Sequence, residues 1–138
     1  MTPEQNIKET LLAVCPNVGH WPLLRDAGVY IGYRPSGDAP EWAGNRAIAS
    51  QVSYDIVIYH RLGHAEEAEA MRYAVYAALR QAGWLLDARG AGPEVYISGG
   101  ELFCWPLTVT RRFYILNNTP LTPEDIRARS AMEGDTSP

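Results

Sequence analysis

Two histidines four residues apart, His60 and His64, are the residues of this sequence whose spacing most suggests chemistry. Glu66 and Glu67 follow them. On one helix this spacing would place two imidazoles together and suggest zinc. Gly63 separates the histidines, however, and His60 ends a predicted strand. A third ligand would have to come from a distant segment, because the two cysteines show no ligand spacing. We therefore predict no metal site.

Nucleophilic catalysis needs an activating base that a third group holds in place. Ser53, Ser98 and Cys104 each lack a recognisable elbow or partner motif. Asp55 lies on the second face of a predicted strand, where an exposed carboxylate is ordinary. Segment 90–93 contains two glycines but leads into a strand, so it predicts a turn and no phosphate-binding loop. We expect no catalytic residue and no cofactor, hence a protein that is not an enzyme.

Arginine and tyrosine side chains suggest contacts with other proteins. Arg111 and Arg112 are neighbours in a predicted strand, so their guanidinium groups point to opposite faces. One of them then points towards the helix layer or an interface and needs a carboxylate partner. Snorkelling of Arg111 at the sheet edge is the plain structural alternative. Tyr73 and Tyr76 recur at helical spacing; both tyrosine and arginine are enriched at interfaces, although these two could equally cover a sheet edge.

Segment 34–46 is predicted to be an exposed loop, because prolines, glycines, an aspartate and an asparagine punctuate it. Trp42 is its only large apolar residue. An exposed tryptophan on a polar loop is hard to explain in a monomer but common in an interface hot spot. The predicted interface residues are Trp42, Arg46, Tyr73, Tyr76, Arg111 and Arg112.

Apolar periodicity predicts the elements that position these residues. Thr2-Pro3-Glu4-Gln5 begins a helix with a capping box, and Pro16 ends it. A second helix is expected over 65–82, with Gly83 as its stop. Strands are predicted over residues 29–34, 50–61, 94–98 and 103–116. Pro106 cannot donate to a ladder, so the start of the last strand is expected at a sheet edge.

The order α-β-β-α-β-β predicts an α+β fold. It is a two-layer sandwich, in which two helices pack on one face of a mainly antiparallel four-stranded sheet. The apolar face of strand 50–61 should lie beneath the Met71, Val75 and Leu79 stripe of the second helix. The single domain is expected to span residues 1–118. Residues 119–138 then hold a short helix from Thr122 and a disordered tail.

Composition limits the classes of function. The 138 residues suit one domain, and 46% hydrophobic with 20% charged residues is globular. The net charge of −4 argues against a general nucleic-acid binder. The N-terminus has no signal-peptide pattern, and no apolar run is long enough for a membrane span. Cys15 and Cys104 are expected to be buried free thiols in a reducing compartment.

The order and texture of these segments resemble the tail terminator and tail completion proteins of long-tailed bacteriophages and prophages. The resemblance covers residues 2–116 and begins with the amphipathic helix and a Tyr/Pro loop entry. The segments that carry it further are Tyr54-Asp55-Ile56-Val57-Ile58-Tyr59, Ala68-Glu69-Ala70-Met71-Arg72-Tyr73-Ala74-Val75, Gln81-Ala82-Gly83-Trp84 and Thr110-Arg111-Arg112-Phe113-Tyr114-Ile115. Residues 121–138 fall outside it.

The resemblance implies a structural virion protein, assembled in the bacterial cytoplasm. Such a protein forms a homo-oligomeric ring, usually a hexamer, at the head-proximal end of the tail tube. The ring stops tube polymerisation and joins the filled head, so its partners are the tail-tube protein and a head-completion or neck protein. DNA only passes through the lumen, and neither membrane nor cofactor is involved.

Three alternatives stay open. The chain could be another neck or head-completion subunit, or a component of a tail-like secretion machine. A small-ligand-binding or regulatory α+β domain has the same size and composition. An enzyme would have to assemble its site from His60, His64 and Asp55.

Overall fold

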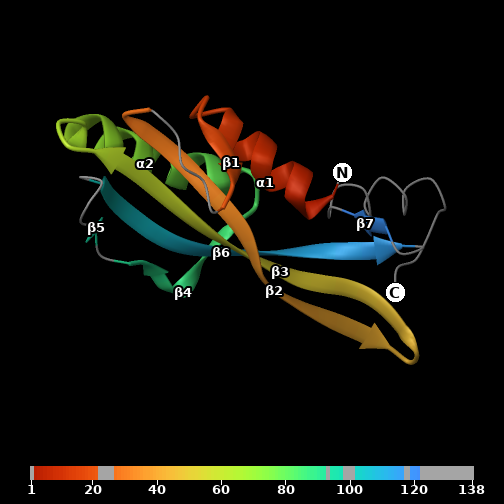
Figure 1. Cartoon of the computed structure of the whole chain (residues 1–138). Coiled ribbons are helices and arrows are strands. Elements are labelled where there is room, and N and C mark those ends of the chain that lie inside the picture. The colour runs from red at the N-terminus through yellow and green to blue at the C-terminus, as the bar shows by residue number, and fades with distance from the viewer. Residues whose placement is uncertain (1, 22–26, 93, 98–101, 117–118, 122–138) are drawn as a thin grey trace.

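A computed structural model describes residues 2–21, 27–92, 94–97, 102–116 and 119–121 (Figure 1). Within them, two helices lie on one face of a seven-stranded mixed sheet. The α+β class predicted from the sequence is therefore confirmed. The helix predicted from Thr122 lies outside the described residues.

Helix α1 (Pro3–Leu12) begins with the predicted capping box. The amide of Gln5 donates to Thr2 Oγ1 at 3.1 Å, and the amide of Thr2 donates to Gln5 Oε1 at 2.9 Å. These bonds satisfy amides that have no partner inside the helix. Helix α2 (Ala65–Gln81) ends as expected before Gly83, whose φ of +92° favours glycine.

The strands include the four that were predicted and three that were not. The predicted ones are β2 (Val29–Ala43), β3 (Arg46–Arg61), β5 (Val95–Ile97) and β6 (Leu102–Leu116). The others are β1 (Val18–His20), β4 (Leu85–Ala91) and β7 (Thr119–Leu121). The sheet runs β1-β2-β3-β6-β4, while β5 and β7 also pair with β6. Only β1 and β2 pair in parallel.

One face of β3 forms the centre of the core. Val52, Tyr54, Ile56 and Ile58 alternate along it, and all four are buried together with Val75 and Leu79 of α2. The packing expected between these two periodic patterns is thus confirmed, with Met71 only partly buried at its margin. Trp84, just after α2, ties the helices together, because its Nε1 donates to Asn6 Oδ1 of α1 at 2.7 Å. Burial raises the pKa of Tyr54 to about 12.

The prediction of a loop over residues 34–46 is wrong. Strands β2 and β3 stay paired as far as Ala43 and Arg46, and Gly44 turns the chain with φ +63°. We call residues 37–53 the arm; it projects at one end of the sheet (Figure 1). Its residues resembled a loop because neither face of its outer part is buried, so no apolar alternation marks it. Bulges after Pro35 and Glu41 accommodate its irregular composition.

The expectation that β6 starts at a sheet edge is also wrong. Strand β6 pairs with β3 on one side and, over Leu102–Cys104, with β5 on the other. Pro106 lies between the part of β6 that pairs with β5 and the part that pairs with β4. Its carbonyl accepts a hydrogen bond from the Gly92 amide at 2.7 Å. A residue without an N–H fits this gap between two short strands.

Replacing Val75 by Asp tests the core. The unpaired carboxylate would be buried against β3, which costs several kcal/mol, so we expect the domain to unfold. The neighbouring Ala74 is exposed on the same helix, and Ala74→Asp should leave the melting temperature almost unchanged. Thermal unfolding followed by circular dichroism compares the two. Equal melting temperatures for both variants and the wild type would contradict this packing.

Candidate functional site

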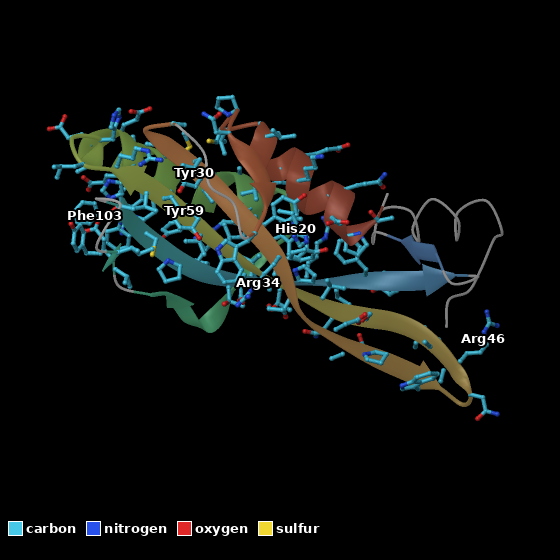
Figure 2. The ribbon with its side chains drawn as sticks, in the orientation of Figure 1. His20, Tyr30, Arg34, Arg46, Tyr59 and Phe103 are labelled. Atoms are coloured by element: carbon cyan, nitrogen blue, oxygen red, sulfur yellow. The ribbon has the colours of Figure 1, made fainter. Side chains whose placement is uncertain are left out.

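Apolar side chains at the tip of the arm are exposed to solvent. Trp42 is 63% exposed and Ile48 is 40% exposed. Arg46 is exposed beside them, paired across the hairpin with Ala43, and no ion pair engages it within the described residues (Figure 2). Trp42 therefore lies as exposed as the sequence predicted, but on a strand end and not on a loop.

Arg112 holds the arm to the body of the sheet. It extends from the face of β6 that the helices leave open, and its Nε donates to Glu41 Oε2 at 2.7 Å. Its Nη1 also donates to Tyr114 Oη at 2.8 Å. The hydrogen bond with Glu41 raises the pKa of the Arg112 guanidinium. A second bond within the arm joins Ser50 to Asp38. These contacts add to the backbone pairing between residues 49–53 of the arm and β6.

Arg111 points the opposite way, towards the helix layer, as alternation predicted. Its Nη1 donates to the carbonyl of Ala82 at 2.5 Å, where α2 ends. Its guanidinium also lies 5.0 Å from the ring centroid of Phe113. A cation at this position satisfies a helix-terminal carbonyl and complements the helix dipole. The structure therefore gives Arg111 a role within the chain.

Of the two predicted tyrosines, Tyr73 lies on the exposed face of α2, and Tyr76 lies half-buried at the margin of the core. Tyr73 is 58% exposed, and its ring meets that of Tyr76 edge-on with centroids 6.2 Å apart. The guanidinium of Arg72 lies 5.1 Å from Tyr73 and 4.1 Å from Trp105. Both tyrosines thus belong to one surface, with Arg72 anchoring Tyr73 to the sheet.

A groove of about 340 Å³ adjoins this surface between α2 and β4. Two of its side chains, Leu85 and Leu86, are 68% and 43% exposed. The residues that line it are Tyr76, Leu79, Arg80, Trp84, Leu85, Leu86 and Val109. The sequence analysis missed the groove, although the apolar pair directly after Trp84 was a signal for it.

The face of the sheet opposite the helices holds an aromatic cluster. Tyr30 and Tyr59 (Figure 2) stack with centroids 4.8 Å apart. The Trp21 indole donates a hydrogen bond to the Tyr59 hydroxyl. Arg34 lies 3.7 Å over the Trp21 ring and 3.5 Å from Asp55. Trp21, Arg34 and Asp55 border a second groove of about 310 Å³.

The residues of the enzyme alternative do not come together. His60 is 3% exposed, with its Nε2 2.6 Å from Glu94 Oε1 and its ring stacked on Phe103. His64 is exposed, with its Nδ1 2.9 Å from Glu67 Oε2. Asp55 lies on the opposite face of β3 from His60 and accepts a hydrogen bond from Thr108. Among the residues described, no three His, Cys, Asp or Glu side chains are placed to share a metal ion.

The two cysteines belong to different clusters. Cys15 lies in the core under the helices, and Cys104 lies on the opposite face with Tyr59. Both are free thiols, and burial raises the pKa of each. Cys15 is buried as predicted, whereas Cys104 is only partly so.

Replacing Arg111 or Arg112 by Ala separates the roles of the two guanidinium groups. Arg111→Ala removes a charged hydrogen bond at the end of α2, so it should lower the free energy of unfolding by about 1.5–3 kcal/mol. The Arg112–Glu41 pair is 40% exposed on both sides, so Arg112→Ala should cost less than about 1 kcal/mol. Urea denaturation measures both. A larger loss for Arg112→Ala would contradict this assignment.

None of the helices in the described part of the chain has the length and apolarity that crossing a membrane requires. No family model matches the sequence, and no curated protein is significantly similar to it.

Proposed function

We propose that this protein forms a ring at the head-proximal end of a phage tail, where it terminates tail-tube polymerisation and enables head–tail joining. The observation that carries the proposal is the arm, with the exposed Trp42 at its tip. Exposing a large aromatic side chain to water is unfavourable, and tryptophan is enriched in interface hot spots. Glu41 and Arg112 hold the arm in place, which suits a contact formed without much loss of conformational entropy.

Side chains, and not the backbone, would make the arm's contact. Beyond Tyr33, the outer edge of β2 has no partner strand within the described residues. Pro35 and Pro40 lie along that edge and cannot donate a hydrogen bond to an added strand. The two bulges of the arm also disturb any continuous ladder. These features favour a discrete assembly over open-ended sheet extension.

The proposal includes the partners that the family resemblance implies. The ring is a hexamer that contacts the tail-tube protein on one side and a head-completion or neck protein on the other. DNA passes through its lumen without being bound, which fits the net charge of −4.

A second candidate is a small-ligand-binding domain. The groove of about 310 Å³ beside Trp21, Arg34 and Asp55 favours it, because aromatic and charged side chains meet there. The charged groups already satisfy each other, however: Arg34 pairs with Asp55, which also accepts from Thr108. We therefore rank this function below ring formation.

Deleting the gene from the phage or prophage that carries it tests the proposal. Tail tubes should over-extend or fail to join heads, which negative-stain electron microscopy counts directly. A Trp42→Ala copy should restore few joined particles, because the arm would lose its apolar anchor. A Leu12→Ala copy is the matched control, since Leu12 is an exposed apolar residue on α1. Normal-length tails joined to heads in the deletion strain would refute the function.

A further inference from the structure

We propose that the groove between the N-terminal end of α1 and the base of the arm binds a primary ammonium group carried on a short alkyl chain. The feature that points to this site is the hydroxyl of Tyr54, which reaches the groove without a hydrogen-bond partner in the described residues. The site goes beyond the proposed function and does not depend on ring formation.

The groove lies where α1 begins beside the base of the arm. The N-terminal end of α1 points to the end of the sheet from which the arm projects (Figure 1). The first turn of α1 lines the groove together with residues 35–38 of β2. Tyr54 of β3, directly opposite Pro35 in the strand register, lines it as well. Its volume of about 600 Å³ lies within the roughly 300–1,000 Å³ typical of ligand sites.

Tyr54 carries the observation that points to a ligand. It is only 4% exposed, and its ring packs edge-on against Trp84 with centroids 5.8 Å apart. Within the described residues no hydrogen bond engages its hydroxyl, but this oxygen is not among the fully enclosed polar atoms that lack a partner. The hydroxyl therefore opens onto accessible space at the groove. A nearly buried polar group without a partner is unusual in a native protein and needs an explanation.

The charge around the groove selects a cation. Glu4 and Asp38 line it, whereas none of the described lining residues is Lys or Arg. Asp38 accepts a hydrogen bond from Ser50, and Glu4 Oε1 lies 3.8 Å from His20 Nε2. Burial first, and then the charge of Glu4, raise the pKa of Tyr54 to about 12, so this carboxylate acts on the hydroxyl. A cation bound here would meet both the hydroxyl oxygen and a negative charge.

An anion is the alternative to consider, because helix N-termini ordinarily attract negative charge. At α1 the capping box already uses the amides of Thr2 and Gln5, and Pro3 has no amide hydrogen. Glu4 already places a carboxylate in the first turn. An anion would therefore meet like charge and few free donors.

The other residues of the groove suit an alkyl chain. Pro3, Pro35 and Val52 line it beside Tyr54 and offer apolar carbon atoms. A primary ammonium has three donors, so it can bond to the Tyr54 hydroxyl and to a carboxylate at the same time. A metal ion fits less well, because no three His, Cys, Asp or Glu side chains of the described chain are placed to share one. A free amine and the lysine side chain of a partner protein both carry the required group.

Titration of the wild-type chain with n-butylamine tests the site by two-dimensional amide NMR. At about pH 8 an imidazole is ordinarily neutral, so His20 would not compete with the ammonium for Glu4. The amides of Glu4 and Gly37, which both line the groove, should shift with a Kd on the order of 1 mM. Butanol and butyrate keep the alkyl chain without the positive charge, and they should bind about tenfold more weakly or worse.

Two variants assign the contacts. Tyr54→Phe removes the hydroxyl and keeps the ring against Trp84, so the affinity should fall about tenfold or more. The melting temperature of this variant should stay the same or rise, because no hydrogen bond of the described chain is lost. Glu4→Gln should weaken binding about twofold to fivefold, since the Glu4 side chain is half exposed. Glu9→Gln removes an exposed carboxylate elsewhere on α1 and is the matched control.

A lysine derivative with both backbone ends blocked separates the two sources of the ammonium. Binding as tight as that of butylamine assigns the site to a lysine of a partner protein, whereas its exclusion assigns the site to a free amine; both results support the site. Butylamine that leaves the two amides unshifted overturns the inference, as does equally tight binding of butanol, butyrate or sulfate. A Tyr54→Phe chain that binds like the wild type, or that melts at a lower temperature, overturns it too. The deletion strain tests the tail function separately.

Discussion

The architecture depends on the burial of one face of β3 beneath α2. Tyr54, Ile56 and Ile58 alternate with period two, while Val75 and Leu79 repeat with the period of a helix. Once these faces meet, the register of β3 is fixed, because a shift of one residue would expose the whole apolar set. The pairing of β3 with β2 and β6 on either side then determines where the arm leaves the sheet and which face stays open.

Much of this framework could be predicted because residues close together in the sequence determine it. The capping box at Thr2 and the stop at Gly83 each fix a backbone conformation through neighbouring residues alone. Strands β1 and β7 have only three residues each, too few to show a period. They form because long-range pairing with β2 and β6 supplies their hydrogen bonds. The propensities of single residues carry no information about a strand partner that is distant in the sequence.

In the candidate site, too, the features set by neighbouring residues could be predicted and those set by tertiary packing could not. Trp42 was predicted to be exposed because its neighbours are polar, and that reasoning did not require the correct secondary structure. The α2–β4 groove could not be predicted, since Tyr76 meets Leu86 only after the chain has turned at Gly83. The two neighbouring arginines illustrate both cases. Alternation placed Arg111 and Arg112 on opposite faces, but their partners, Ala82 and Glu41, depend on tertiary packing.

The prolines along the outer edge of β2 have an evolutionary consequence. Because Pro35 at the base of the arm and Pro40 within it cannot donate main-chain hydrogen bonds there, the backbone of this edge contributes little recognition of its own. In the proposed assembly, a few tip residues would therefore determine the partner, and they could be exchanged without disturbing the hairpin. Related chains can then diverge in partner choice by point substitution while keeping the fold, so that two such proteins made in one cell need not assemble with each other.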